Sequence, residues 1–427
     1  MAKIQAIRGM NDVLPEQTPA WQYLETVMRD LLAAYAYREI RFPIVEQTQL
    51  FKRSIGEVTD IVEKEMYTFE DRNGDSLSLR PEGTACCVRA AEQHGLLYNQ
   101  VQKLWYMGPM YRHERPQKGR YRQFHQMGVE AFGMSGWDIE LEMLVLTADL
   151  WKRLGISDYV TLEINNLGTS EDRAAYTLHL RDYLLNHREA LDPDSQNRLD
   201  KNVLRILDSK NPQTQEIISG APSLAESLSE QSREQFTRLL EALESMGIQA
   251  VENSNLVRGL DYYNGLVFEW TTDKLGAQAT VCAGGRYDGL SRQLGGTDTP
   301  AVGFALGIER LILMLEETGK LPESVGTDVD VYVAVIGEGV REQAFSLSHE
   351  LRNRIPGLRV LTHCGGGKYN SQLKKAFASK ARCAVILEGS EELAEIKIRI
   401  LDEGGKTETV QSASVGDWLS EFFNSVD

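Results

Sequence analysis

The first hydrophobic pattern along the chain is a helical one near the N-terminus. Apolar residues recur there at spacings of three and four, which places them on one face of a helix; they are Trp21, Leu24, Val27, Met28, Leu31, Leu32 and Tyr35. The pattern ends before residues 41–45, a short β-branched stretch that contains Pro43. Because proline has no backbone N–H to donate, this stretch predicts an extended segment at the edge of a sheet.

Residues 66–134 change to the alternating pattern of strands and turns. Alternation on both sides of Asn73 and Gly74 predicts a β-hairpin, since this dipeptide is a strong hairpin signal. Residues 103–114 and 122–133 have the pattern of two antiparallel strands that flank a basic loop. Two further elements are expected after them, a helix and a strand, at residues 137–154 and 161–168.

The polar stretch from residue 170 to 250 shows helical periodicity and few strand signals. Its clearest apolar stripe is followed by Gly247, the residue type that most easily ends a helix; the stripe consists of Phe236, Leu239, Leu240, Leu243 and Met246. Strand patterns return at residues 265–272 and 303–306. We therefore predict a helical insertion, about residues 170–250, inside an antiparallel-sheet domain.

A second domain is predicted beyond a turn-rich boundary at residues 318–328. Strand and helix patterns alternate after it in βαβαβ order, followed by a hairpin through Gly404 and Gly405 and by a last helix. This order predicts a small α/β domain with a mainly parallel sheet. The expected fold class is thus α+β, with residues 1–325 as the larger domain and 326–427 as the smaller one.

The composition fits a large globular protein. The 427 residues are 42% hydrophobic and 25% charged, which excludes a disordered chain, a collagen-like fibre and a disulfide-rich miniprotein. No apolar run approaches the roughly 20 residues that span a bilayer, and the N-terminus lacks the pattern of a secretory signal. The five cysteines form no CxxC pair, which is typical of reduced thiols in a cytoplasmic protein.

The net charge of −16 argues against indiscriminate nucleic-acid binding, but the charge is distributed unevenly. Residues 112–122 carry five basic residues and one acidic residue, and residues 368–382 carry five basic residues and no acidic one. An arginine at a strand end, such as Arg112, can hold a phosphate through two guanidinium nitrogens. A solvated basic hairpin explains the first stretch equally well.

Two segments place charged residues beside glycines and tyrosines. In residues 256–265, Arg258 stands among apolar and aromatic side chains, so it needs an anionic partner when buried. That partner is either a ligand or Asp261 of the same segment. In residues 283–290, two adjacent glycines let the backbone approach a ligand closely, although a tight turn is the favoured interpretation.

Two other segments indicate polar groups at helix starts. Residues 303–312 pass from a small-residue strand into a helix with Arg310, which could hold one end of a nucleotide or simply belong to a buried turn. Residues 79–85 place Glu82 and Thr84 where they could receive an ammonium group or cap a helix. The sequence has no GxxxxGK[ST] loop, no GxGxxG after a strand and no metal-binding histidine spacing.

The joint order of these segments resembles the bacterial histidyl-tRNA synthetase family along essentially the whole chain. RGMNDVLP at 8–15 is similar to the family's N-terminal signature, and the first helix with the Pro43 segment resembles class II motif 1. MYRHERPQKGRYRQFHQ resembles motif 2, GFALGIERL resembles motif 3, and LVRGLDYYNG and AGGRYDGL resemble the two histidine-specific segments. The resemblance implies a class II catalytic domain with a six-stranded antiparallel sheet, a helical insertion, and a C-terminal α/β anticodon-binding domain.

The resemblance also implies a role for each candidate residue. The residues expected to bind ATP are Arg112, Glu114, Arg258 and Arg310, of which Arg112 and Arg258 form the catalytic pair at the α-phosphate. The residues expected to bind histidine are Glu82, Gly83, Thr84, Gln126, Glu130, Tyr262, Tyr263 and Tyr287. Within that set, Glu130 and Tyr263 would bind the imidazole nitrogens. The residues expected to reach the acceptor end of the tRNA, with its extra 5′ guanosine, are Gln117, Lys118 and Arg120.

The implied reaction is the ATP-dependent ligation of L-histidine to its tRNA through histidyl-adenylate. Mg²⁺ would arrive with ATP, with no metal site fixed by the protein, and the motif 1 region would form a homodimer. One alternative is a non-catalytic relative, the regulatory subunit of ATP phosphoribosyltransferase, which typically lacks the basic motif 2 loop and the C-terminal domain. This sequence has both, which favours the synthetase. A generic RNA-binding module would explain only the basic stretches.

Overall fold

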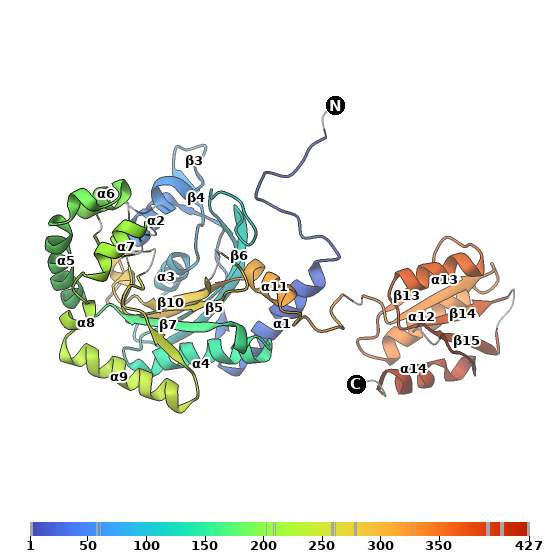
Figure 1. Ribbon diagram of the computed structural model, residues 1–427. Coiled ribbons are helices and arrows are strands. Elements are labelled where there is room, and N and C mark those ends of the chain that lie inside the picture. Colours follow the sequence, from blue (N-terminus) through green and yellow to red (C-terminus); the bar gives the residue numbers. More distant parts are fainter. Residues whose placement is uncertain are drawn as a thin grey trace. The chain divides into compact units, whose positions relative to one another are not determined.

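The computed structural model in Figure 1 describes most of the chain: residues 3–56, 59, 61–201, 203–207, 209, 211–257, 260, 262–276, 280–326, 328–389, 393–401 and 405–424. The chain divides into two compact units, one of residues 1–14 and 20–321 and the other of residues 15–19 and 322–427. No helix in the described ranges is both long and apolar enough to cross a membrane.

The larger unit is built on an eight-stranded sheet. Six of its strands pair antiparallel, in the spatial order β5 (Gln102–Tyr111), β6 (Gln123–Phe132), β11 (Ala301–Gly307), β10 (Thr280–Arg286), β9 (Asn264–Thr271) and β7 (Thr161–Asn166). A short parallel strand is added at each edge, β1 (Arg38–Glu39) beside β5 and β8 (Ala250–Glu252) beside β7. The resemblance implied six strands; the two edge strands are too short to leave an alternating pattern in the sequence.

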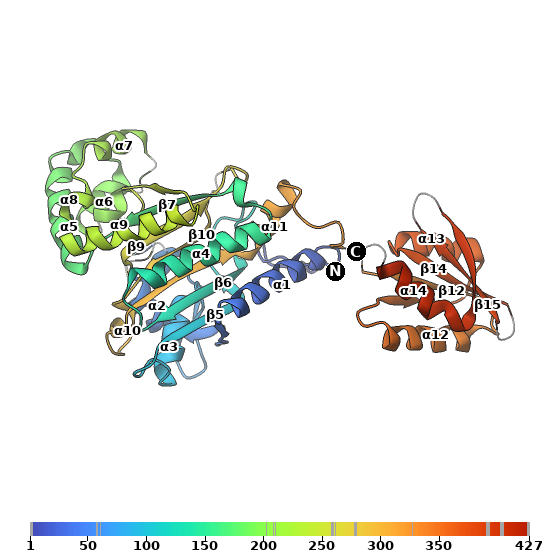
Figure 2. The same ribbon diagram turned by 90° about the horizontal axis from the view of Figure 1, so that it is seen from below.

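Helices cover both faces of this sheet. The predicted N-terminal helix is α1 (Thr18–Ala34), and it lies with α4 (Trp137–Arg153) across one face, as Figure 2 shows from below. On that face, Trp270 Nε1 of β9 donates to Thr147 Oγ1 of α4 at 2.9 Å. The other face receives α3 (Thr84–Gln93), whose buried side chains join the core that contains Tyr106 and Tyr287. This second face is the one that carries the cavity described below.

A small three-stranded sheet precedes α3. Its strands β3 (Thr68–Glu70) and β4 (Ser76–Leu79) form the predicted hairpin, and β2 (Val45–Gln47) pairs with β4 before α2 (Thr48–Ile55) begins. Of residues 41–45, which were expected to lie along a sheet edge, Val45 begins the edge strand β2 and residues 41–44 belong to neither sheet. The guanidinium of Arg80 instead binds the carbonyl oxygens of Phe42 and Pro43, at 3.1 and 3.3 Å.

Between β7 and β8 the described chain is helical (Figure 1). Its helices are α5 (Ser170–Leu185), α6 (Pro193–Lys201), α7 (Pro212–Ser219), α8 (Leu224–Ser227) and α9 (Glu230–Ser245). The sequence caps them locally: the Thr169 hydroxyl accepts from the Asp172 N–H in a capping box, and Ser229 caps α9. Gly247 follows α9 at a φ of 74°, a conformation that glycine adopts without steric cost.

The smaller unit is a five-stranded sheet with helices on both faces. Its strand order is β13 (Val360–Thr362), β12 (Val331–Ile336), β14 (Cys383–Glu388), β15 (Glu395–Ile400) and β16 (Thr407–Gln411). Cores on opposite faces involve α12 (Arg341–Arg354) with α14 (Val415–Asn424), and α13 (Tyr369–Ala378). The sheet is mixed, whereas the sequence predicted a mainly parallel one. Among the described strands of this sheet, the parallel pairs are β12 with β13 and β12 with β14, because the chain after β14 returns through hairpins instead of crossover helices.

Candidate active site

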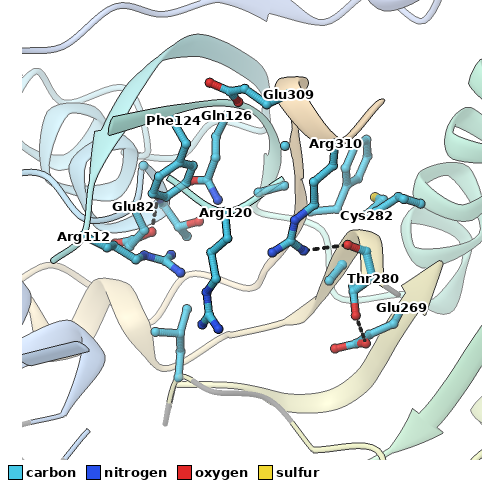
Figure 3. A pocket seen from close by; sticks show the side chains of 18 of the residues that line it. Glu82, Arg112, Arg120, Phe124, Gln126, Glu269, Thr280, Cys282, Glu309 and Arg310 are labelled. Atoms are coloured by element: carbon cyan, nitrogen blue, oxygen red, sulfur yellow. Dashed lines mark hydrogen bonds between the residues drawn. The ribbon is translucent and has the colours of Figure 1, made fainter. Parts of the chain in front are cut away.

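A cavity of about 270 Å³ opens on the face of the large sheet that carries α3. Its floor is formed by strands β6, β9, β10 and β11, and its wall includes the start of α3, the start of α11 (Ile308–Glu317) and the loop between β5 and β6. Figure 3 shows Arg112, Arg120 and Arg310 converging on it, with Glu82 and Gln126 beside Arg112. The predicted ATP and histidine segments therefore meet in one cavity.

Two adjacent glycines follow Ala283, a residue that lines the cavity. Gly284 and Gly285, for which a tight turn was favoured, lie instead inside β10. A Cβ at Gly284 would lie 2.3 Å from the Gly303 carbonyl oxygen, and a Cβ at Gly285 would lie 2.4 Å from that of Leu266. The prediction of a turn was wrong because these glycines satisfy close backbone approach between strands rather than a reversal of the chain.

Glu82 sits at the buried start of α3. Its carboxylate accepts hydrogen bonds from the backbone N–H groups of Thr84, at 2.6 Å, and Ala85, at 3.0 Å. Burial raises the pKa of Glu82, while these two N–H groups and the nearby Arg112 guanidinium oppose the rise. The helix-capping interpretation is therefore confirmed by the geometry, and it does not remove Glu82 from the cavity wall, which it lines.

Glu130 lies under the cavity floor, bound by three hydroxyl groups. Thr84 Oγ1 donates to Glu130 Oε1 at 2.8 Å, Tyr106 OH donates to the same oxygen at 3.0 Å, and Tyr287 OH donates to Oε2. Burial raises the pKa of Glu130 to about 8, and the three hydroxyls oppose that rise. A buried carboxyl group that is oriented by three hydrogen bonds can recognise a polar atom of a ligand selectively.

Gln126 gives the cavity an acceptor. Its Oε1 atom is buried and receives no hydrogen bond from the described residues. Gln126 lines the cavity beside Glu82, as Figure 3 shows. A buried amide oxygen in this state is costly unless a ligand donates to it, so its position suits an ammonium group or another donor.

Three guanidinium groups line the adjoining end of the cavity, which begins where Arg112 lies beside Glu82. Arg112 Nε donates to the Pro81 carbonyl oxygen at 2.9 Å, and the Arg112 guanidinium lies 5.2 Å from the centre of the Phe124 ring. Arg310 donates through Nη1 to the Thr280 carbonyl oxygen at 2.7 Å. Burial, followed by repulsion from Arg120 and Arg112, lowers the pKa of Arg310. An anionic ligand would relieve this repulsion, so the cluster suits phosphate groups.

Carboxylates border the same end. Glu269 accepts from Thr280 Oγ1 at 2.7 Å, and both oxygens of Glu309 accept from the His125 N–H at 2.9 Å. The described residues contain no cluster of three or more His, Cys, Asp and Glu side chains arranged to hold a metal. Glu269 and Glu309 line the cavity at separate places, as Figure 3 shows, and Glu309 Oε1 also lies 2.9 Å from His125 Nδ1. These two carboxylates therefore do not form a preformed metal site.

The loop between β5 and β6, residues 112–122, is tied to three other segments. Its end is bonded to the N-terminal segment, because the Gly9 carbonyl oxygen accepts from the N–H groups of Arg122 and Gln123, at 2.7 and 3.2 Å. Its tip is bonded to α11, through Arg310 Nε to the Gly119 carbonyl oxygen at 3.2 Å and Lys118 Nζ to Glu317 Oε1 at 2.5 Å. His113 N–H donates to the Glu65 carbonyl oxygen at 2.7 Å.

The structure brings most of the predicted site residues together. Those that line the cavity are Glu82, Gly83, Thr84, Arg112, Glu114, Arg120, Gln126, Tyr262, Tyr263 and Arg310. Glu130 and Tyr287 reach it only from below the floor, and Gln117 and Lys118 lie outside its lining. Arg258 and its alternative partner Asp261 are outside the described residues.

Sequence reasoning missed several lining residues, among them Tyr106, Phe124, Glu269 and Thr280. Phe124 had a usable signal, because strand side chains alternate and Phe124, two positions before Gln126, must share its face. Tyr106 had none, since a tyrosine inside an apolar strand reads as ordinary core.

Comparisons with known proteins identify the family of the chain. A family model for histidyl-tRNA synthetase matches residues 9–311, more than half of the chain. The structure of apo histidyl-tRNA synthetase from S. aureus is 32% identical, with a TM-score of 0.82 and coverage of 98% of this chain and 100% of that one.

Two more distant structures share the fold. A histidyl-tRNA synthetase from Nostoc sp. is 19% identical, with a TM-score of 0.72 over 99% of this chain and 100% of that one. A protein from Bacillus halodurans described as an ATP phosphoribosyltransferase regulatory subunit/histidyl-tRNA synthetase is 23% identical, with a TM-score of 0.65 over 91% and 99%. The family match and the S. aureus similarity together confirm the resemblance, and the chain belongs to the histidyl-tRNA synthetase family, as an aminoacyl-tRNA ligase for histidine.

Proposed function

We propose that this cavity is where the chain activates L-histidine with ATP and then transfers the histidyl group to the 3′ end of its tRNA. The observation that carries the proposal is that two polar environments adjoin in the cavity. At one end Glu82 and Gln126 line it, with Glu130 under the floor, and at the other end lie the guanidinium groups of Arg112, Arg120 and Arg310, with Arg112 at the boundary beside Glu82. An amino acid and a nucleotide triphosphate need these two environments side by side.

Histidine would bind at the carboxylate end. Its ammonium group would lie between Glu82 and Gln126, where the Gln126 amide oxygen supplies the acceptor, with Gly83 and Thr84 alongside. Glu130 and Tyr263 would bind the two imidazole nitrogens, and Tyr262 and Tyr287 would enclose the ring. The three tyrosine rings already pack together, with centroids 4.7 to 6.2 Å apart.

ATP would bind at the guanidinium end. Arg112 would hold the α-phosphate, Glu114 would orient the loop through its ion pair with Arg120, and Arg310 would hold the γ-phosphate. Arg258 is assigned to the α-phosphate from the resemblance alone. Mg²⁺ would arrive with ATP and would neutralise phosphate charge when bound. The arginines would orient the triphosphate and stabilise negative charge that grows on it.

The chemistry takes two steps. In the first, a carboxylate oxygen of histidine attacks the α-phosphorus, the bond to the bridging oxygen breaks, and pyrophosphate leaves. In the second, a hydroxyl of the terminal tRNA ribose attacks the carbonyl carbon of the adenylate and AMP leaves with the bonding electron pair. No covalent intermediate with the protein is needed, so positioning and charge stabilisation account for catalysis.

The remaining assignments concern the macromolecular partners. Gln117, Lys118 and Arg120 would contact the acceptor end of the tRNA, and the smaller unit would bind the anticodon. The motif 1 region around α1 would pair two chains in an isologous homodimer, and the protein would act in the cytoplasm. Exposed apolar residues such as Ile44 and Val45 near this region support an interface there.

One assay tests the proposed activity against the regulatory alternative. Histidine-dependent exchange of radiolabelled pyrophosphate into ATP, without tRNA, requires only the first step. We expect exchange that saturates with histidine and is absent with other amino acids. A folded sample that binds histidine but performs no exchange would favour the regulatory role.

A further inference from the structure

The Glu130 carboxylate has four acceptor positions, two on each oxygen. Thr84 and Tyr106 occupy both positions on Oε1, and Tyr287 occupies one on Oε2. The described residues supply no further donor, so a single position on Oε2 remains. This oxygen lies against Gly303, whose backbone lines the cavity, and a Cβ there would be 1.8 Å from it. The missing side chain leaves Oε2 within reach of a ligand.

Tyr106 is held in place by a slot made of two glycines. Its ring is 2% exposed, and a Cβ at Gly83 or at Gly128 would lie only 2.1 Å from a ring carbon. The Phe42 ring packs edge-on against it with centroids 4.9 Å apart. The ring therefore has little freedom to turn, and its hydroxyl has a fixed direction toward Glu130.

We infer that Tyr106 is a specificity-determining positioning residue, which fixes the Glu130 carboxylate so that one acceptor position on Oε2 faces a ring N–H of the amino-acid substrate. The inference rests on the proposed role of Glu130 in binding the imidazole. Tyr106 acts through Glu130, since its own hydroxyl bond is directed at that carboxylate. A substrate ring without an N–H would leave this acceptor unpaired, which a buried site disfavours strongly.

The hydroxyl of Tyr106 also favours the ionised, accepting form of Glu130. Burial raises the pKa of Glu130, Glu82 raises it further, and the hydroxyls of Tyr287, Thr84 and Tyr106 lower it. The other titratable groups that interact with Glu130 are Tyr37, Cys87 and Tyr262. Loss of one hydroxyl would therefore move the Glu130 pKa upward, and the carboxyl would remain protonated to a higher pH.

The test is Tyr106→Phe, which removes one hydroxyl and keeps the ring in its slot. A matched control is Tyr35→Phe: Tyr35 is half-buried, and its hydroxyl also donates to a carboxylate, Asp149 Oδ2, at 2.6 Å. Tyr35 lies outside the cavity lining. Pyrophosphate exchange is measured from pH 6 to 9 in three series, in which the concentration of histidine, of ATP or of β-(thiazol-4-yl)alanine is varied. The ring of this analogue has no N–H.

We expect Tyr106→Phe to raise KM for histidine about tenfold, as for a lost hydrogen bond to a charged group, with KM for ATP almost unchanged. The acidic limb of the kcat/KM profile for histidine should move to higher pH, and the preference for histidine over the thiazole analogue should fall. Tyr35→Phe should change none of these.

Three results would overturn the inference: equal effects of the two variants, an unshifted pH profile with only a lower melting temperature, or a Tyr106→Phe protein that does not fold. Glu130→Gln separates this inference from the proposed function. If Glu130→Gln leaves KM for histidine unchanged, the proposed role of Glu130 is wrong and the inference falls with it. If Glu130→Gln raises it and Tyr106→Phe does not, only the inference is wrong.

Discussion

The two ends of the cavity are polar in different ways. At the carboxylate end, Glu130 is bound by three side-chain hydroxyls and Glu82 by two backbone N–H groups at the start of a helix. At the guanidinium end, Arg112 and Arg310 donate to backbone carbonyl oxygens, at Pro81, Gly119 and Thr280. The carboxylates of the first end are held by a network of hydroxyl and N–H donors. The arginines of the second end donate to carbonyl oxygens, which phosphate oxygens can replace as acceptors.

This difference follows from what each ligand offers. An imidazole differs from other side chains by the placement of single hydrogen bonds, so its site gains selectivity when the protein groups are already oriented. A triphosphate brings large charge and many equivalent oxygens, so its site needs donors that can shift from carbonyl oxygens to phosphate oxygens. Variants at the two ends should accordingly fail in different ways.

The largest effect is expected at the guanidinium end. Arg112→Ala removes a donor from the proposed α-phosphate site and should lower the rate of adenylation at saturating substrates by roughly 10²–10³. Arg112→Lys should restore only part of it, because an ammonium group lacks the guanidinium fork. Single-turnover adenylate formation measures this. Arg238→Ala, an exposed arginine on α9, is the control, and a rate for Arg112→Ala within threefold of wild type would contradict the assignment.

Variants at the carboxylate end should weaken the binding of histidine rather than slow the reaction. Glu130→Ala is expected to weaken histidine binding roughly 10- to 100-fold, because the substrate N–H loses its charged acceptor and three hydroxyls lose their partner. ATP binding should change by less than twofold. Isothermal titration with each ligand tests the contrast, and equal losses for histidine and ATP would sink the division of the cavity.

The buried carboxyl group of Glu130 should also make the free energy of unfolding depend on pH. The pKa of Glu130 in the folded chain, about 8, lies above its ordinary value of 4.5. Between these values the unfolded chain has released this proton and the folded chain has kept it, so the free energy of unfolding falls as pH rises. Glu130→Gln should remove this contribution. Denaturant unfolding at pH 5, 6.5 and 8 should show wild type losing stability relative to Glu130→Gln; parallel curves would refute it.

The smallest effect is expected at the tip of the basic loop. Lys118 and Glu317 are exposed, so Lys118→Ala should leave folding and adenylation unchanged. Transfer to tRNA should slow a few-fold, with a weaker dependence on salt, because one phosphate contact is lost. Glu317→Ala keeps the lysine and should not slow transfer. Transfer rates from preformed adenylate decide this, and equal effects of both variants would mean that the ion pair matters rather than the lysine.

Much of the fold was predictable from local pattern. The periodicity of α1, the hairpin at Asn73 and Gly74, and strands β5 and β6 each follow from spacing within one segment. The mixed sheet of the smaller unit was not, since the sequence does not record which edge β15 joins. The strand position of Gly284 and Gly285 was not either, because the atoms that exclude a Cβ there belong to β11, to β9 and to Tyr263 just before β9.

Some residues of the candidate site could likewise be predicted from the sequence, and others could not. Arg112 stood out by charge, and Arg310 by its place at a strand–helix junction. Glu130 was identified only through the family resemblance, since one carboxylate in a strand gives no signal of its own. Tyr106 was missed altogether: its slot is made by Gly83 and Gly128, which lie on different elements and meet only in the folded chain.

The bond between Gly9 and the end of the basic loop has a practical consequence for handling the protein. Gly9 is buried at a φ of 85°, and an added Cβ would lie 2.8 Å from a Pro116 carbon. Its carbonyl oxygen is the acceptor for two loop amides, and the turn before it is closed by a bond from Met10 N–H to the Ile7 carbonyl oxygen at 2.9 Å. Expression variants trimmed past residue 7, or with an affinity tag joined there, would thus alter the loop proposed to receive the tRNA.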